Sequence, residues 1–311
     1  MNRFYKFAIA CFASLTLIAP TAFADESDHS FSALFVFGDS LSDSGNSHAD
    51  TGRTAHPPFE PIPNDSYGIG GHHYSNGKTW VEILAKEMGL INSAKPAMRN
   101  PLFGNYAYGG ARARDYLVDS KPDFSAQVQS FLAARNYVAP SDALYVIQFG
   151  GNDLRDALTA ALMQQDFMVI LEDAIGAVVT NIGILSQRGA RKFLIVSAPN
   201  LGASPAVPDD FKSLVAGLSF GYNQGLTDAL AFYFPQGLEF YYLDLFEFVT
   251  AATTTPEGFG FTNVVSPCLT YYVTEGAFCE NRDGHLFWDD AHPTKAAHKI
   301  IGGIAANALP D

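Results

Sequence analysis

The chain has 311 residues, of which 48% are hydrophobic and 16% charged, and its formal net charge is −13 at pH 7. Such an acidic chain repels phosphates, so we do not expect it to bind nucleic acid. Electrostatic docking on anionic lipid is excluded for the same reason, and any transient contact with a lipid interface must be apolar. The length suits one large domain or two smaller ones, and no linker, repeat or charged block divides it.

The first 24 residues have the pattern of a secretory signal peptide. Arg3 and Lys6 precede an apolar core at residues 7–18, and residues 22–24 form an A-x-A cleavage site. We therefore expect a secreted or periplasmic protein that is cleaved near Ala24, with residues 25–311 forming a single domain. No later stretch approaches the ~20 apolar residues of a transmembrane helix.

Apolar runs alternate with helical patterns along the rest of the chain. This alternation predicts an α/β fold with a parallel sheet covered by helices on both faces. The run at 34–37 is continuously apolar, which is typical of a strand that is buried on both faces. The full prediction places strands at 34–37, 144–149, 193–196 and 240–243, and helices at 79–87, 124–134, 167–187, 211–232 and 295–307.

A Gly-Asp-Ser turn follows the first predicted strand and makes Ser40 a candidate nucleophile. Ligands of open α/β sheets bind just beyond the carboxyl ends of the strands, and Ser40 lies two residues past Gly38. A serine in this position could equally cap a helix. A nucleophilic serine also needs a base and a group that orients the base. The stretch FWDDAHP at residues 287–293 supplies both.

Four separated blocks of the sequence resemble the GDSL family of lipolytic enzymes, also called SGNH hydrolases. The blocks are GDSLSDSGN at 38–46, NYAYGGA at 105–111, GGND at 150–153, and the pair Asp289 and His292. The resemblance covers nearly the whole mature chain. It implies the three-layer α/β/α SGNH-hydrolase fold, which is flavodoxin-like and has a mainly parallel central sheet.

The same resemblance implies a role for each motif residue. Ser40 would be the nucleophile, His292 the base and Asp289 the acid that orients the base. The backbone NH groups of Ser40 and Gly110 and the side-chain amide of Asn152 would form the oxyanion hole. The plainer interpretations are that Gly110 belongs to a simple turn and that Asn152 caps the next helix.

The histidine block also has an internal ambiguity. His292 precedes Pro293, which favours an extended conformation, so one loop can carry both the acid and the base. Asp290 is the alternative acid, and only the family spacing selects Asp289. The other histidines have no comparable partner in a motif and are expected on the surface or in loops: His29, His48, His56, His72, His73, His285 and His298.

A second serine lies in a pattern that resembles a catalytic motif. Residues 217–221 read G-x-S-x-G, the nucleophile elbow of α/β-hydrolases, with Ser219 at its centre. That elbow requires a strand immediately before the serine. Residues 209–220 instead have apolar residues at helical spacing, so we do not expect Ser219 to be the nucleophile.

Two cysteines, Cys268 and Cys279, remain after cleavage of the signal peptide. An even count in an exported protein favours a disulfide between them. The enclosed stretch at 269–278 is rich in aromatic residues. It is either a lip over the active site or an ordinary stapled surface loop.

The residues together predict acyl transfer through an acyl-Ser40 intermediate, with no metal and no cofactor. Within the family, the region of Cys268 to Cys279 and the stretch YSNGKTW at 74–80 look most like secreted bacterial lysophospholipases A and their acyltransferase relatives. Aromatic residues at 258–261 and in the cysteine loop, if exposed, suit an acyl chain. A lysophospholipid or another single-chain acyl ester is therefore the expected substrate, with acyl transfer to another alcohol as a side activity.

Two alternatives remain open at the level of sequence. Aromatic side chains also stack on sugars, so a carbohydrate acetylesterase is the second hypothesis. An exported lipid- or glycan-binding protein without turnover is the third. The sequence makes no prediction of the oligomeric state.

Overall fold

The centre of the fold is a parallel sheet of four strands in the order β1-β2-β3-β4. The computed structural model describes residues 31–310 except 117, 119, 120 and 235, and the signal peptide predicted at 1–24 lies outside the described residues. The predicted α/β class is confirmed. The strands are β1 Leu34–Gly38, β2 Leu144–Gln148, β3 Lys192–Val196 and β4 Glu239–Leu243.

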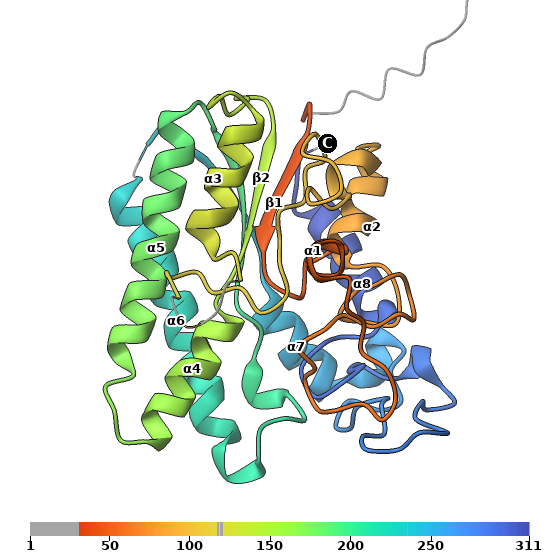
Figure 1. Ribbon diagram of the computed structural model, residues 1–311. Coiled ribbons are helices and arrows are strands. Elements are labelled where there is room, and N and C mark those ends of the chain that lie inside the picture. Colours follow the sequence, from red (N-terminus) through yellow and green to blue (C-terminus); the bar gives the residue numbers. More distant parts are fainter. Residues whose placement is uncertain (1–30, 117, 119–120, 235, 311) are drawn as a thin grey trace, which may run out of the picture.

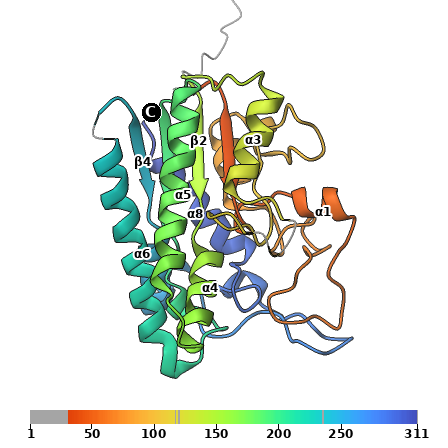
Figure 2. The ribbon, with the colours of Figure 1, turned by 60° about the vertical axis from the view of Figure 1, so that its left-hand side comes forward.

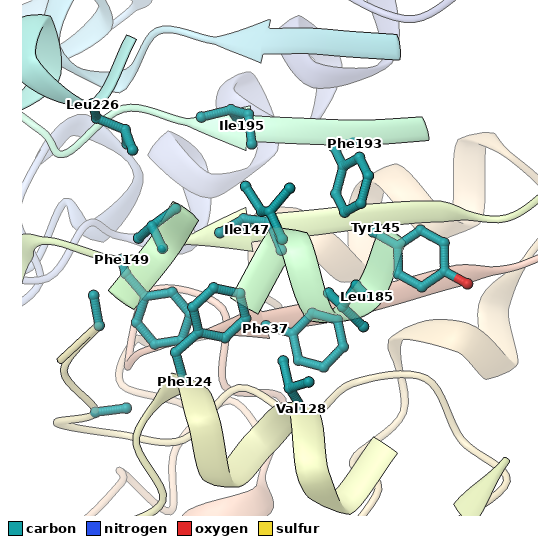
Figure 3. Close-up of a cluster of buried hydrophobic side chains, with 14 of the residues drawn as sticks. Phe37, Phe124, Val128, Tyr145, Ile147, Phe149, Leu185, Phe193, Ile195 and Leu226 are labelled. Carbon is teal, nitrogen blue, oxygen red and sulfur yellow. The ribbon is translucent and has the colours of Figure 1, made fainter. Parts of the chain in front are cut away.

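Alternate side chains of the strands enter two hydrophobic clusters on opposite faces of the sheet. In β1, Phe35 and Phe37 join one cluster, whereas Leu34 and Val36 join the other. β2 and β3 divide their side chains in the same way, and Figure 3 shows the first cluster. These strands are therefore buried on both faces, as the apolar runs predict. β4 is more exposed, with Tyr242 49% accessible.

Helices cover both faces of the sheet, which gives the three-layer architecture that the sequence predicts (Figure 1). Figure 2 shows α4, α5 and α6 side by side on one face. On this face lie α3 Phe124–Ala134, α4 Gly151–Leu162, α5 Met168–Gln187 and α6 Lys212–Tyr233; on the other lie α2 Trp80–Glu87, α7 Leu245–Thr254 and α8 Lys295–Asn307.

The predicted helices agree with the observed ones to within one residue at each end. Their starts follow from local chemistry, because side-chain oxygens satisfy the free NH groups of the first turn. Thr79 and Glu82 form a capping box at α2, and Asp123 and Thr294 cap α3 and α8. Three helices were not predicted, namely α4, α7 and the short α1 at Asn46–Thr51.

Helix α5 corrects the expectation that no later stretch is as apolar as a transmembrane helix. Met168–Gln187 is long and apolar enough to cross a membrane by length and composition. Its buried side chains, which include Leu171, Val178 and Ile182, belong to the first hydrophobic cluster. The helix packs against α3, α4 and α6. A helix that packs within the fold can therefore be as long and as apolar as a transmembrane helix.

Cys268 and Cys279 form the predicted disulfide. The bond closes a short aromatic loop, in which Leu269 and Phe278 pair as an isolated antiparallel bridge. Phe278 also stacks on Trp288, with 5.5 Å between the ring centroids. The loop therefore packs against Trp288, in the C-terminal segment that carries Asp289.

We predict that the double substitution Cys268→Ser and Cys279→Ser lowers the free energy of unfolding by about 3 kcal/mol, because the bond closes a loop with a sequence separation of 11. Urea unfolding monitored by circular dichroism measures the change, and reduced wild-type protein serves as the control. An unchanged urea midpoint in both samples would contradict a stabilising role.

Candidate active site

The structure brings together the three residues that the sequence pattern selects, although 252 positions separate the first from the last. Nε2 of His292 lies 2.8 Å from Oγ of Ser40. Nδ1 of the same ring lies 2.8 and 2.9 Å from the two carboxylate oxygens of Asp289. Asp289 is fully buried and His292 is 5% exposed. This is the geometry of a serine, a base and an orienting acid.

The turn after β1 presents Ser40 at the carboxyl edge of the sheet. Gly38 is required there, because a Cβ at this position would lie 2.8 Å from the backbone oxygen of Gln148. The carbonyl of Asp39 accepts hydrogen bonds from the NH groups of Ser42 and Asp43. Ser40 caps no helix, since α1 begins only at Asn46 and its N-cap residue is Gly45.

Asp39 adds a second buried carboxyl beside Ser40. Burial raises its pKa to about 6, although hydrogen bonds from the Leu41 NH and the Gln148 side chain oppose the shift. Asp39 is 2% exposed and lines the same cavity as Ser40. Its charge therefore changes in the weakly acidic range, within reach of the field of His292.

Asp289, and not Asp290, contacts the histidine. Burial opposes ionisation of Asp289, but the charge of His292 and hydrogen bonds from His292, Tyr67 and the Ala291 NH together hold its pKa below the usual value. The carbonyl of Asp290 instead accepts hydrogen bonds from the Ser204 hydroxyl and the Ala206 NH.

Two tyrosines that the sequence reasoning missed pack against this acid and base. The Tyr67 hydroxyl donates to Oδ2 of Asp289 at 2.7 Å. The Tyr74 ring lies 5.4 Å from the His292 ring, centroid to centroid. Both tyrosines come from the connection between α1 and α2. No motif marks Tyr67, so the sequence carried no signal for its contact with Asp289.

The candidate oxyanion donors lie around the turns that follow β1 and β2. Asn152 is in the first turn of α4, where Gly150 is the N-cap residue, so Asn152 does not cap the helix. Its Nδ2 donates to the carbonyl of Ala111 at 2.9 Å, which ties it to the segment that contains Gly110. In the described part of the chain, the backbone NH groups of Ser40 and Gly110 have no hydrogen-bond acceptor.

Ion pairs anchor this segment to α4. Arg114 bonds to Asp153 and Asp156, with both distances 2.7 Å, and Arg112 bonds to Asp156 at 2.9 Å. Asp153 is fully buried and also accepts from the Ala113 NH. The position of the Gly110 turn relative to Asn152 is therefore fixed by buried, charge-assisted hydrogen bonds.

An apolar cavity of about 260 Å³ opens beside Ser40 and His292. Its walls come mainly from α4 and from the segment 199–215 that leads into α6. Arg155 is the cation among the lining residues. The apolar walls are formed by Ile62, Leu154, Leu158, Leu201, Val207 and Val215.

The two aromatic segments expected to contact an acyl chain do not line this cavity. None of the lining residues belongs to 258–261 or to the cysteine loop. Phe261 is only 3% exposed, and Phe259 packs against the second hydrophobic cluster. The interpretation of the cysteine loop as a lip over this cavity is therefore wrong, because no residue of the loop lines the cavity. Phe278 and Tyr271 pack in a cluster with Trp288, whereas Tyr272 is 71% exposed.

Two of the histidines expected on the surface or in loops are buried: His73 lies in a loop, whereas His298 lies in a helix. His298 in α8 accepts a hydrogen bond from the Trp80 NH at 3.2 Å, and burial lowers its pKa to about 3. His73 is 5% exposed and its Nε2 lies 2.8 Å from Oε2 of Glu82. His29, for which a surface or loop position is expected, lies outside the described residues.

Ser219 has the surroundings that the helical pattern predicts. It lies in the middle of α6 and is fully buried. Its hydroxyl donates to the carbonyl of Val215 at 3.0 Å. No strand immediately precedes it, so the G-x-S-x-G pattern does not form a nucleophile elbow here.

Among the described residues, no group of three or more His, Cys, Asp or Glu side chains could hold a metal ion.

A family profile described as GDSL-like lipase/acylhydrolase matches residues 34–303. The chain belongs to this family. Its GDSL relatives include an esterase/lipase of Arabidopsis thaliana, which is 23% identical over 87% of this chain and 85% of the relative. The thermolabile hemolysin of Vibrio parahaemolyticus is 26% identical over 86% of this chain and 61% of the hemolysin.

A solved structure supports the same fold. The structure of LAE5, an α/β hydrolase from the metagenome of Lake Arreo, superposes with a TM-score of 0.50 at 14% identity, and the match covers 91% of this chain and 100% of LAE5. At this identity the likeness concerns the fold alone. Membership of the GDSL family makes the chain a carboxylic ester hydrolase.

We predict that Asp289→Asn lowers kcat on a soluble nitrophenyl ester by about 10³- to 10⁴-fold, because the amide favours the wrong tautomer of His292. Asp290→Asn is the matched control and leaves kcat close to that of the wild type, since its side chain has no contact with His292. If the two variants exchanged these results, the assignment of the acid would be wrong.

Proposed function

We propose that this GDSL enzyme is a secreted serine esterase that cleaves acyl esters of single-chain lipids, of the lysophospholipase A type, through an acyl-Ser40 intermediate. The hydrogen bond of 2.8 Å between Ser40 Oγ and His292 Nε2 supports the chemistry. The apolar cavity beside Ser40 supports the substrate class and is the observation that carries the proposal.

In the first half-reaction, Ser40 Oγ attacks the ester carbonyl carbon while Nε2 of His292 takes the hydroxyl proton. Asp289 stabilises the resulting imidazolium through Nδ1. The carbon–oxygen bond to the leaving alcohol then breaks, and the alcohol receives the proton from His292. In the second half-reaction, water loses a proton to His292 and attacks the acyl group, which releases the acid and regenerates Ser40.

The tetrahedral oxyanion would be stabilised by the NH groups of Ser40 and Gly110 and by the amide of Asn152. Neither NH group has an acceptor in the described part of the chain, so both are available to the oxyanion. Gly110 has a φ of +81°, a conformation that glycine adopts without steric cost. An alcohol in place of water at the second step would give acyl transfer as a side activity.

The cavity favours a fatty acyl chain over an acetyl group. Its lining includes four leucines and two valines, and two of these leucines, Leu154 and Leu158, lie one turn apart on α4. Burying each additional methylene against such walls contributes about 0.8 kcal/mol. An acetyl group would leave most of the cavity unfilled. A carbohydrate acetylesterase is therefore the second candidate.

Export is part of the proposal and rests on two observations. The sequence of the first 24 residues predicts a signal peptide. The disulfide between Cys268 and Cys279 is the kind of bond that persists in oxidising compartments.

The experiment that tests the proposal is the acyl-chain-length profile of the mature protein, from acetyl to palmitoyl esters and including lysophosphatidylcholine. We expect kcat/KM to rise from acetyl to medium chains, because the apolar cavity binds added methylenes, and we expect all turnover to vanish in Ser40→Ala. A sharp preference for acetyl would favour the acetylesterase. Failure of a fluorophosphonate to label Ser40, with no turnover of any ester, would favour a binding protein.

We predict that Leu158→Trp shifts the preference toward short chains by about tenfold or more in the ratio of kcat/KM for octanoyl and acetyl esters, because the indole fills the cavity that holds the chain. Leu162→Trp is the matched control, since it lies one turn further along α4 and is already 55% exposed. Equal ratios in both variants and the wild type would show that the acyl chain binds elsewhere.

A further inference from the structure

Four groups donate to the carboxylate of Asp289, and one of them comes from a distant segment; Nδ1 of His292 lies within hydrogen-bond distance of both oxygens. Oδ1 accepts from the backbone NH groups of Ala291 and His292, at 2.9 and 2.7 Å. Oδ2 accepts from Nδ1 of His292 at 2.8 Å and from the hydroxyl of Tyr67 at 2.7 Å. The backbone bonds fix Oδ1, so Tyr67 is the group that fixes the rotation of the carboxylate about its last bond.

We propose that Tyr67 is a positioning residue of the active site, which holds Oδ2 of Asp289 in line with Nδ1 of the base. The inference rests on the roles proposed above for the serine, the base and the acid. It deepens that proposal, because it assigns part of the catalytic efficiency to a tyrosine 222 positions away in the sequence.

Tyr67 is itself rigidly held. Its side chain is fully buried, and its ring packs edge-on against Phe59 and Trp288, at centroid distances of 5.6 and 5.8 Å. Its backbone NH donates to the carbonyl of His73 at 2.9 Å. Burial, together with the adjacent carboxylate, raises the pKa of its phenol, so the hydroxyl stays protonated as a donor over the whole working range. Such a donor cannot turn away to another partner.

The segment that carries Tyr67 contacts the loop of the acid and base at further points. The Ser75 hydroxyl donates to the carbonyl of Pro293 at 2.8 Å. The side-chain oxygen of Asn76 accepts from the Lys295 NH at 2.7 Å. Together with the packing of Tyr74 on the base, these contacts align the two segments over their length. Several contacts between the two segments therefore fix the position of the Tyr67 hydroxyl.

The hydrogen bond has a predictable electrostatic effect. A donor on Oδ2 withdraws part of the carboxylate charge, so the imidazolium of His292 is stabilised less than by a free carboxylate. Removing the donor makes the imidazolium more stable, so the base is protonated at higher pH. Other ionisable groups also act on this acid and base through their charges, namely Asp39, Tyr271, Asp290 and His298. Among the described residues, only Tyr67 and His292 donate to Oδ2 of Asp289.

The test is Tyr67→Phe, assayed on a soluble ester as a function of pH. We expect kcat to fall about tenfold with KM little changed, because Oδ2 of Asp289 loses the bond that orients it toward Nδ1, and this loss outweighs the stronger attraction of the freed carboxylate for the imidazolium. We also expect the acid limb of the kcat/KM profile to move up by about half a pH unit. Tyr145→Phe is the matched control, since it removes a buried hydroxyl that donates to the carbonyl of Pro140 at 2.8 Å, far from the site.

A second variant keeps the test independent of folding. Replacement of Tyr67 alone by 3-fluorotyrosine retains the ring and strengthens the phenol as a donor, so the acid limb should move to lower pH. An acid limb that stays at its wild-type position in both variants overturns the proposal, even if Tyr67→Phe loses stability as Tyr145→Phe does. Failure of the proposed function can be distinguished from failure of this inference. In that case a fluorophosphonate would not label Ser40 of the wild type, and Ser40→Ala would be as active as the wild type.

Discussion

The parallel pairing of β1 with β2 is the interaction on which the active site depends. It sets Gly38 opposite Gln148, so the turns after both strands leave the same edge of the sheet. Ser40 follows the first strand and Asn152 the second, which places the proposed nucleophile and the proposed oxyanion donor around one cavity. A buried amide reinforces the turn, since Gln127 accepts from the Gly38 NH and donates to its carbonyl, both at 2.9 Å.

Apart from Ser40, polar residues of the first two motif blocks serve to hold the two blocks together. Asp43 accepts hydrogen bonds from the NH groups of Gly45 and Gly109, at 2.8 and 3.0 Å. Asn46 donates to the carbonyls of Asn105 and Ala107, at 2.9 and 2.8 Å. Buried polar groups are costly unless they have partners, so the arrangement in which Asp43 and Asn46 are paired is favoured over others. The blocks thereby fix the Gly110 turn beside β1.

The strands could be predicted because each is a continuous apolar run, and most helices because their apolar residues recur with a period of 3.6. The family motif selected Asp289 and His292 as the candidate acid and base. Helix α7 was missed because it ends in a run of alanines and threonines, and threonine has a low helix propensity. Tyr67 was missed because a contact across 222 positions leaves no local pattern. Aromatic content also does not reveal exposure, so the inward packing of Phe261 could not be read from its neighbours.

Helix α4 carries both a candidate oxyanion donor and part of the cavity wall. Its first turn carries Asn152, and Leu158 follows six residues later, about 9 Å along the helix axis at 1.5 Å per residue. A polar donor and an apolar wall are thus successive features of one rigid element. The ion pairs of Asp153 and Asp156 with the arginines after Gly110 fix that element. Changes further along α4 can therefore alter the fit of the proposed acyl chain while the proposed oxyanion donors keep their positions.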